Sequence, residues 1–350
     1  MKNLLIITQK VDENDNHRGF FVDWIREFAK NFNEVNIITV SKGIYTLPEN
    51  VHIYSLGKER GLSKFMQAII FYWHLARFVS SSSGIFAYSS PIFVIASWPL
   101  AYLYRRKIIL WYLHRSVTLK LKIAEKLAYR IATAAKESLN LKSKKIVEIG
   151  HGININRFKN LEPRTLSHEL TILSIGRISK IRNFETLVKA MGILKNRRLN
   201  FKLKIVGQPV MSPDFKYFED LKKKVGELDL NNQVEFVGFI PYGQTTGYYK
   251  KTDILINPAP KGGIDKVVLE AMAMKCIVFV ANPVFVSYLA GYEKYLLFEY
   301  GNAEDLVDKI EDFLKLSPEK IKEISESLEG SVVKHHDLKK IISKISSMFA

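Results

Sequence analysis

Short apolar runs rich in Val, Ile and Leu alternate along this chain with longer stretches in which apolar residues recur every three or four positions. Each short run predicts a β-strand buried on both faces, and each longer stretch predicts a helix that covers such strands. In the first half of the chain, strands are predicted at Leu4–Thr8, Val35–Val40, Ile85–Tyr88, Ile108–Tyr112 and Ile146–Ile149. Helices are predicted at Gly19–Asn31, Leu62–Val79, Ile92–Tyr104 and Leu119–Ala135.

The pattern restarts after a polar linker, Lys159–Glu169, which contains Pro163. Strands of this second series are predicted at Leu170–Ile175, Phe201–Val206, Val234–Phe236, Ile254–Asn257, Ile277–Val280 and Leu296–Phe298. A chain of 350 residues exceeds what a single hydrophobic core usually supports. We therefore predict an α/β protein with two doubly wound, Rossmann-like domains, residues 1–160 and 166–334, and a C-terminal helix, residues 335–350, that packs back on the first domain.

Composition places the chain among folded globular proteins, because 47% of its residues are hydrophobic and 25% are charged. Cys276 is the single cysteine, which excludes an intramolecular disulfide and a cysteine metal cluster and fits a reducing compartment. The longest apolar stretch, Ile92–Leu103, is interrupted by Pro99 and is too short to span a membrane. The apolar stretch at the N-terminus is too short for a signal peptide, so we expect a cytoplasmic location.

Positive charge is concentrated in one segment. The chain has 52 basic and 35 acidic residues, a net charge of +17, and residues 58–145 alone carry 16 basic and 3 acidic residues, or +13. Such a segment favours contact with an anionic surface or polyanion, whereas a lysine-rich solvated surface is the simpler interpretation. A nucleic-acid-binding protein is an alternative of another class, but no zinc-finger, RRM or KH signature is present.

The common nucleotide and metal motifs are absent from the sequence. There is no P-loop, and the nearest approach to a dinucleotide fingerprint, Gly150–Ile155, lacks the third glycine. No His-Glu-x-x-His pair or clean Asp-x-Asp motif proposes a metal. Neither an oxidoreductase nor a metal-dependent enzyme is favoured.

Two segments of the second domain carry candidate chemistry. In the first, Leu173–Asn183, a strand runs into Gly176 and is followed by Arg177 and Arg182, which suits a diphosphate, although a solvated basic loop has the same appearance. In the second, Asn257–Met274, a strand ends in a Pro/Gly-rich loop that enters a helix bearing Glu270. Its glycines let a ligand approach the backbone, and a carboxylate accepts hydrogen bonds from sugar hydroxyls.

Together these segments resemble the retaining glycosyltransferases of family 4, which have the GT-B fold of two Rossmann-like domains facing a central cleft. The resemblance extends over nearly the whole chain. It rests on the ordered recurrence of His17–Phe21, Ile149–Asn154 with Arg157–Phe158, Ser174–Arg177, Lys204–Gly207, Val234–Gly238 and Val268–Ala273.

The resemblance implies the site residues. Catalytic roles fall to Arg177, Arg182 and His114, and donor binding falls to Gly19, Gly176, Gly207, Gly262, Gly263, Ile264, Asp265, Val268, Leu269 and Glu270. Arg182 stands where the family usually has lysine, and Gly262 stands where it commonly has a glutamate that contacts the sugar. Asp265 either replaces that glutamate or forms a turn. The carboxylate of Glu270 is expected to lie at the cleft, where it accepts hydrogen bonds from the ribose hydroxyls, rather than in the core.

The resemblance further implies transfer of a sugar, with retention, from a UDP- or GDP-sugar to a hydroxyl acceptor, in the synthesis of a cell-surface glycan or glycolipid. No metal and no cofactor are expected, because the two arginines and helix N-termini stabilise the departing diphosphate. His114 is either a ligand-facing or a structural histidine. An epimerase or an inactive relative stays open because of Gly262.

The first domain is expected to receive the acceptor. Lys122, Lys126 and Arg130 are spaced to share one face of the helix predicted at Leu119–Ala135, which is typical of a basic amphipathic helix. The stretch Leu62–Phe78 is rich in aromatic residues and either lies at a membrane interface or packs inside the domain. A lipid-linked or glycan acceptor, reached from the inner face of an anionic membrane, is the favoured interpretation.

Overall fold

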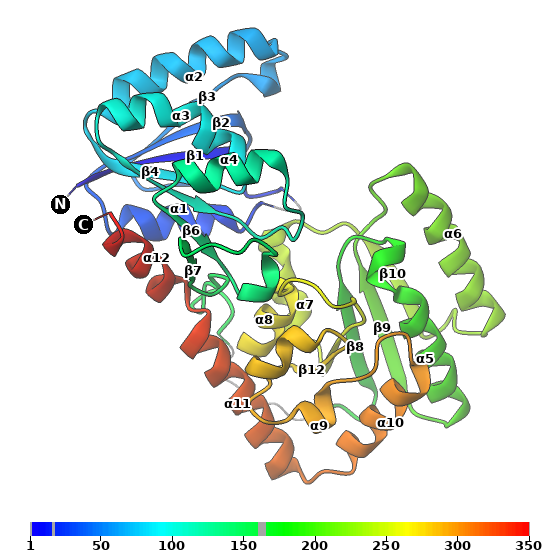
Figure 1. Ribbon diagram of the computed structural model, residues 1–350. Coiled ribbons are helices and arrows are strands. Elements are labelled where there is room, and N and C mark those ends of the chain that lie inside the picture. The colour runs from blue at the N-terminus through cyan, green and yellow to red at the C-terminus, as the bar shows by residue number, and fades with distance from the viewer. Residues whose placement is uncertain (1, 16–17, 160–165, 350) are drawn as a thin grey trace. The chain divides into compact units, whose positions relative to one another are not determined.

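The computed structural model describes residues 2–15, 18–159 and 166–349 (Figure 1). The chain divides into two compact units. Unit 1 comprises Met1–Asn154, Pro241–Gly243 and His336–Ala350, and unit 2 comprises Ile155–Ile240 and Gln244–His335. His17 and most of the predicted linker, including Pro163, lie outside the described residues.

Unit 1 is built on a seven-stranded parallel sheet in the order β3-β2-β1-β4-β5-β6-β7. Its strands are β1 Asn3–Val11, β2 Val35–Lys42, β3 Val51–Ser55, β4 Ser82–Tyr88, β5 Lys107–Trp111, β6 Arg130–Thr133 and β7 Ile146–Glu148. Its α-helices are α1 Phe21–Ala29, α2 Lys64–Val79, α3 Pro91–Leu103, α4 Leu119–Leu127 and α12 Leu338–Ser347. Short 3-10 turns occupy Lys58–Arg60 and Lys136–Ser138.

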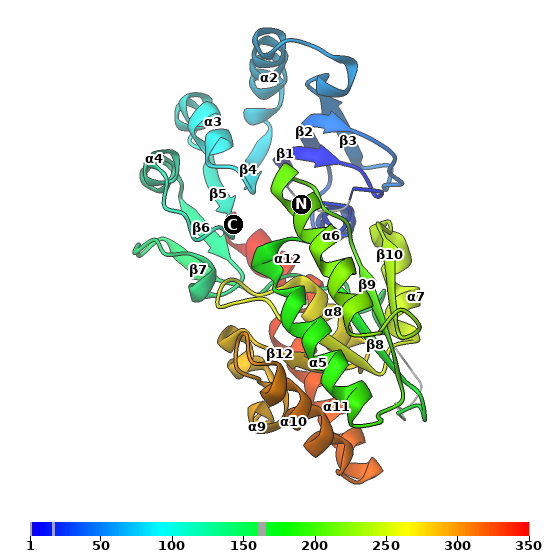
Figure 2. The same cartoon turned by 90° about the vertical axis from the view of Figure 1, so that its right-hand side faces the viewer.

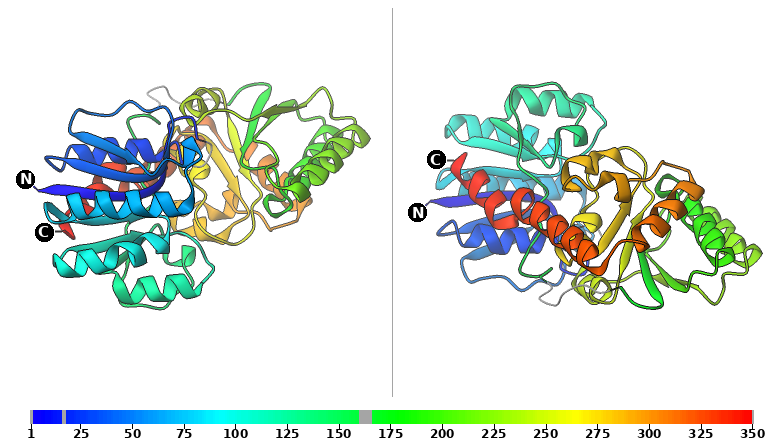
Figure 3. Two further views of the ribbon diagram at one scale, coloured as in Figure 1. Left: turned by 90° about the horizontal axis from the view of Figure 1, so that it is seen from above. Right: turned by 90° about the horizontal axis from the view of Figure 1, so that it is seen from below.

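Helices cover both faces of this sheet. On one face, α1 and α12 enclose a core that includes Trp24, Phe28 and Trp111. On the other face, α2, α3 and α4 pack side by side over a second core (Figures 2 and 3). The C-terminal segment joins unit 1 through Ile153, whose N–H donates to the His336 carbonyl at 2.7 Å and whose carbonyl accepts from Leu338 at 2.9 Å.

Unit 2 is built on a five-stranded parallel sheet in the order β10-β9-β8-β11-β12. Its strands are β8 Leu170–Ile175, β9 Phe201–Val206, β10 Val234–Gly238, β11 Ile254–Asn257 and β12 Ile277–Val280. Its α-helices are α5 Phe184–Asn196, α6 Ser212–Glu227, α7 Thr245–Lys250, α8 Lys266–Ala273, α9 Glu293–Leu296, α10 Ala303–Leu314 and α11 Pro318–His335. Further 3-10 turns occupy Lys180–Arg182 and Pro283–Tyr288, and the 3-10 turn Tyr242–Gln244 begins in the Pro241–Gly243 segment of unit 1. The prediction of two doubly wound parallel sheets is confirmed.

The predicted helix Leu119–Ala135 is wrong in its second half. Helix α4 ends at Leu127, and Arg130 begins strand β6, which pairs with β5. The Lys145 ammonium donates to the carbonyls of Glu125, Lys126 and Ala128 at 2.7, 2.8 and 2.9 Å, which satisfies the last turn and ends the helix there. Arg130 therefore does not share a helix face with Lys122 and Lys126.

The sequence prediction contains two further errors, one strand that is not formed and one that was missed. The segment Leu296–Phe298 is not a strand, because Leu296 ends α9 and Leu297 makes only an isolated bridge with Val280. The sequence pattern also missed β3, an edge strand whose residues are exposed or half-buried and which carries no apolar run.

Candidate functional site

The site predicted in unit 2 lies where the strand order of its sheet reverses. From β8 the chain continues to β9 on one side, whereas β11 continues to β12 on the other. Ligands of open parallel sheets bind outside the carboxyl ends of the strands at such a switch point. Arg177 and Arg182 follow β8, and the glycine loop with Asp265 follows β11, so both predicted segments border this point.

Two glycines hold the loops after β8 and β9 against each other. Gly207 has φ +141°, and a Cβ built on it would lie 1.9 Å from the carbonyl oxygen of Gly176. The Gly176 N–H donates to the Val206 carbonyl at 2.9 Å, and the Gly207 N–H donates to the Gly238 carbonyl at 2.8 Å. Only glycine fits at position 207, because any side chain collides with backbone.

Arg182 is held by groups from the neighbouring strand. Its Nη1 donates to Asp265 Oδ2 at 2.6 Å, and the side-chain amide of Asn257 donates to the same oxygen at 3.1 Å. The guanidinium lies beside Gly176, since a Cβ on that glycine would be 3.5 Å from Arg182 Nε. Asp265, which precedes α8, thus fixes the arginine in orientation while leaving the side chain partly exposed.

Arg177 is held more loosely. Its Nε lies 3.8 Å from Oδ2 of Asp214, a residue in the first turn of α6. At that distance no hydrogen bond forms. The guanidinium is therefore more open to a ligand than that of Arg182.

An asparagine that the sequence reasoning missed supports the glycine loop. Asn282 is buried just beyond β12; its Oδ1 accepts from the Gly262 N–H at 3.3 Å and its Nδ2 donates to the Gly263 carbonyl at 3.1 Å. Asn257 was missed in the same way. A polar residue at the carboxyl end of a buried parallel strand is the signal that could have found both.

Glu270 differs from its predicted setting. The residue is only 2% exposed, its Oε2 accepts from the Tyr249 hydroxyl at 2.9 Å, and its Oε1 lies 3.7 Å from the Lys266 amine. Val268 and Leu269 are also buried, so these two positions can offer only backbone groups to a ligand. The side chain of Ile264 is buried as well, so it anchors the loop to the apolar interior.

His114 and Gly19 belong to unit 1. His114 is exposed just beyond β5, and its ring packs edge-on against Tyr112 at 5.4 Å. Gly19 lies in a tight turn where a Cβ would be 2.6 Å from the Glu13 carbonyl oxygen. Nearby at the end of β4, burial raises the pKa of Tyr88, so its phenol stays protonated.

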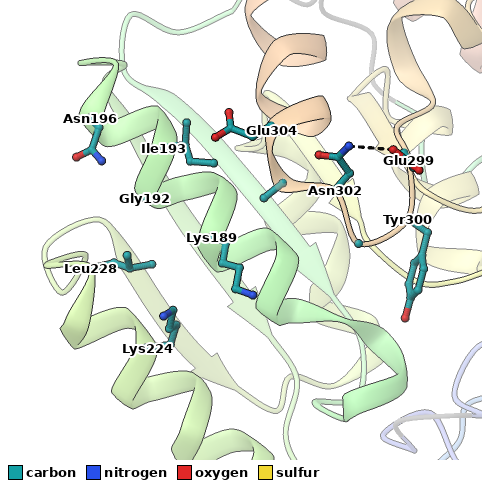
Figure 4. Close-up of a pocket in the computed structure, with 12 residues that line it drawn as sticks. Lys189, Gly192, Ile193, Asn196, Lys224, Leu228, Glu299, Tyr300, Asn302 and Glu304 are labelled. Carbon is teal, nitrogen blue, oxygen red and sulfur yellow. Dashed lines mark hydrogen bonds between the residues drawn. The ribbon is translucent and has the colours of Figure 1, made fainter.

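A separate hollow of ≈ 690 Å³ lies on unit 2 between α5, α6 and residues 299–304 (Figure 4). Both lysines that line it form ion pairs. Lys189 Nζ lies 2.8 Å from Glu185 Oε1, and Lys224 Nζ lies 3.4 Å from Glu227 Oε2. The residues that line it do not include those predicted for the donor site. We therefore assign the candidate site to the sheet edge.

Within residues 2–15, 18–159 and 166–349, no group of three or more His, Cys, Asp or Glu side chains is arranged to hold a metal ion. The one cysteine, Cys276, is buried, and its thiol donates to the Tyr249 carbonyl at 3.2 Å.

Comparison with known proteins decides the class of unit 2. Residues 156–328 match the protein family described as Glycosyl transferases group 1. The chain carries a Glycosyl transferases group 1 domain. This group 1 domain contains both predicted segments, from Gly176 to Glu270.

Two curated relatives are similar to part of the chain. One, described as an uncharacterized glycosyltransferase of Haemophilus influenzae, is 29% identical over 151 residues, 43% of this chain. The other, alpha-monoglucosyldiacylglycerol synthase of Streptococcus pneumoniae, is 28% identical over 183 residues, 50% of this chain. The matched part spans 40% of the length of each relative.

The fold is similar to solved structures over its whole length. The crystal structure of Anabaena HepE in complex with UDP and glucose superposes with a TM-score of 0.72 and 15% identity, covering 99% of this chain and 98% of that one. The predicted fold class, GT-B with two Rossmann-like parallel sheets, is confirmed. Membership of family 4 and a retaining mechanism stay predictions.

Proposed function

We propose that the chain is a glycosyltransferase that moves a hexosyl unit from a UDP- or GDP-sugar to a hydroxyl acceptor with retention, as family 4 enzymes do. The observation that carries the proposal is the position of Arg177 and Arg182 at the switch point of the group 1 domain, opposite a glycine loop that enters α8. Two guanidinium groups beside backbone N–H groups are suited to a diphosphate.

In the proposed reaction, the bond between the anomeric carbon and the diphosphate oxygen breaks, and its electron pair leaves with the nucleoside diphosphate. The acceptor oxygen bonds to the same face of the sugar, and its proton passes to a phosphate oxygen. Arg182, held by Asp265 before the donor arrives, costs little reorganisation as negative charge develops. We further propose that Asp265 contacts the sugar, because Gly262 provides no carboxylate there.

The donor and the acceptor are proposed by analogy with relatives. HepE was crystallised with UDP and glucose, which favours a uridine nucleotide. The pneumococcal relative is named as a synthase of a diacylglycerol glycolipid, which favours a lipid-linked or cell-surface acceptor. We propose that the enzyme works as a peripheral protein at the inner face of the cell membrane. No helix among the described residues is long and apolar enough to cross a bilayer.

The test is incubation of the protein with UDP- and GDP-sugars, with calorimetric measurement of nucleotide affinity and detection of released nucleoside diphosphate. Binding and slow release with one base, both weakened in Arg182→Ala, support the proposal. Interconversion of the sugar without release of the nucleotide would favour the epimerase alternative, and binding without any turnover would favour an inactive relative.

A further inference from the structure

Helix α2 turns an apolar face away from the domain. Phe71, Leu75 and Phe78 are buried against the sheet, yet Phe65 is 74% and Trp73 is 59% exposed. Ile69 and Tyr72 lie between them on the same outer side and are also exposed. The helix is thus apolar on both sides, whereas a surface helix of a water-facing domain is normally polar on its outer side.

The apolar surface continues over the two neighbouring helices. Of the 20 large hydrophobic side chains exposed in the described part of the chain, 12 lie between Phe65 and Tyr129. Those on α3 and α4 include Tyr102 and Leu119, which are 72% and 73% exposed. Helices α2, α3 and α4 form one layer over the sheet (Figures 2 and 3). Because the inner side of this layer packs on the buried core, its exposed apolar side chains lie on the outer side of unit 1. We call this side the helical layer.

The basic residues of the helical layer have few acidic neighbours. Lys120, Lys122 and Lys126 are exposed on α4, and in the described part of the chain no carboxylate lies within ion-pair distance of their amines. Two of the three acidic residues of the segment are already engaged by hydroxyls, Glu59 by Ser55 and Glu125 by Ser143. The positive charge is therefore available to a partner.

Aromatic and basic groups are interleaved. The Arg77 guanidinium lies 5.7 Å from the ring centre of Trp73, and the Lys107 amine lies 5.0 Å from the ring centre of Tyr129. Aromatic rings and basic side chains that keep their charged ends in water are the groups that favour a membrane interface.

We propose that the helical layer docks on a bilayer containing anionic lipids, with Phe65 and Trp73 inserted among the acyl chains and the α4 lysines above the headgroups. A second copy of the chain does not fit, because two surfaces of the same positive sign repel. A nucleic acid offers phosphates to the lysines but no apolar phase for Ile69 or Leu119. The purpose of docking, access to a lipid-linked acceptor, rests on the proposed function, whereas the surface itself does not.

Sedimentation with vesicles of phosphatidylcholine, with and without phosphatidylglycerol, tests the charge. The protein should bind only vesicles that contain the anionic lipid, and Lys120→Gln with Lys122→Gln and Lys126→Gln should weaken binding by roughly 100-fold, at about fivefold for each lysine. Lys216→Gln with Lys222→Gln and Lys223→Gln, on α6 of unit 2, makes the same change of charge and should leave vesicle binding unchanged. Equal losses in the two triple variants would overturn the assignment to the helical layer.

Fluorescence tests the insertion. Trp24 and Trp111 are buried, whereas Trp98 on α3 is half-buried and Trp73 is exposed. In a Trp98→Phe variant, a blue shift on adding vesicles should therefore come from Trp73, and lipids brominated in the acyl chains should quench it. Phe65→Ser with Trp73→Ser should abolish sedimentation, whereas Val210→Ser with Phe215→Ser, two exposed apolar residues of unit 2, should not. Absence of quenching, or dimerisation of the protein that the first pair of substitutions reverses, would overturn the proposal.

Calorimetric titration with UDP separates failure of this proposal from failure of the proposed function. UDP binding by a protein that ignores anionic vesicles refutes docking alone. Vesicle binding without affinity for any nucleotide refutes the proposed function and leaves docking standing.

Discussion

Two positively charged regions of this molecule are built in opposite ways. At the edge of the five-stranded sheet, Arg182 lies 2.6 Å from Asp265, whose carboxylate also accepts from Asn257. On the helical layer of unit 1, Lys122 and Lys126 are exposed without such partners in the described part of the chain. One region fixes the direction of a single charge, and the other spreads several charges over a surface.

The difference indicates what each region can bind. A guanidinium held in place loses little freedom on meeting a compact anion, so it suits a ligand with a defined geometry. Unpaired lysines on flexible stems suit a partner whose charges are numerous and mobile, because no single geometry is required. The same residue class thus serves a small ligand in one unit and an extended surface in the other.

The largest expected effect comes from disturbing the close contact between Gly207 and Gly176, the glycine beside Arg182. Gly207→Ala would bring a Cβ to 1.9 Å from the Gly176 carbonyl oxygen, so the free energy of unfolding should fall by about 3 kcal/mol or more. Gly226→Ala, within α6 where no atom lies nearby, should instead be neutral or stabilise by up to about 1 kcal/mol. Chemical denaturation of both variants measures the contrast, and equal stabilities would show that the two loops are free to separate.

The next effect concerns the ligand. Arg182→Ala should weaken UDP binding by roughly ten- to a hundredfold, because it removes a charge-assisted hydrogen bond of about 1.5–3 kcal/mol. Arg197→Ala is the matched control. Arg197 follows the C-terminal end of α5, whereas Arg182 precedes the helix, and Arg197 also pairs with carboxylates, those of Glu304, Asp308 and Glu311. Calorimetry should give an unchanged UDP affinity for that variant, and a similar loss in both would deny Arg182 any specific role.

A buried pair should respond chiefly through stability. Glu270→Gln removes the negative charge that lies 3.7 Å from the Lys266 amine in a setting nearly closed to water, at a cost of about 1–3 kcal/mol of unfolding free energy. Glu235 is exposed and its carboxylate lies 3.3 Å from the amine of the half-buried Lys204, so Glu235→Gln should cost less than about 0.5 kcal/mol. If Glu270→Gln melts like the parent but loses donor affinity, the carboxylate reaches the ligand after all, as the sequence predicts.

The smallest effect on stability is expected at Arg177. Its Nε is 3.8 Å from Asp214 and the side chain is partly exposed, so Arg177→Ala should change the free energy of unfolding by less than about 0.5 kcal/mol. UDP affinity should nevertheless fall severalfold, which would place Arg177 among ligand-facing rather than structural arginines. A thermal shift larger than that of Glu270→Gln would contradict this reading of a loosely held side chain.

The strands of both sheets could be predicted because most are buried on both faces and carry continuous apolar runs. Ile254–Asn257 and Ile277–Val280 were placed at their observed bounds for this reason. Arg130 was misplaced because the basic spacing of α4 continues by coincidence into β6, while the group that ends the helix, Lys145, lies far along the chain. Because a tertiary contact ends this helix, the local sequence pattern does not predict where the helix stops.

The candidate site was predictable in its types of residue but not in its contacts. Gly176, Arg177 and Arg182 follow β8 as the sequence indicates. Asp265, the partner of Arg182, follows another strand and lies 83 positions away along the chain. Asn282, which supports the loop at Gly262 and Gly263, lies about 20 positions beyond them, and no local rule predicts either pairing. The buried carboxylate of Glu270 accepts a hydrogen bond from the Tyr249 hydroxyl. Tyr249 belongs to α7, which precedes β11 in the chain, whereas Glu270 belongs to α8, which follows it.

The return of the C-terminal segment to unit 1 has a consequence for biosynthesis. Phe349 occupies the space left by Gly84, where a Cβ would be 2.4 Å from its ring, and its ring also approaches Phe32 at 6.4 Å. Unit 2 is therefore an insertion within unit 1, and the first sheet emerges from the ribosome with one face still lacking α12. Because α12 follows unit 2 in the chain, unit 2 can complete its fold before the helix that closes this face of unit 1 has been synthesised.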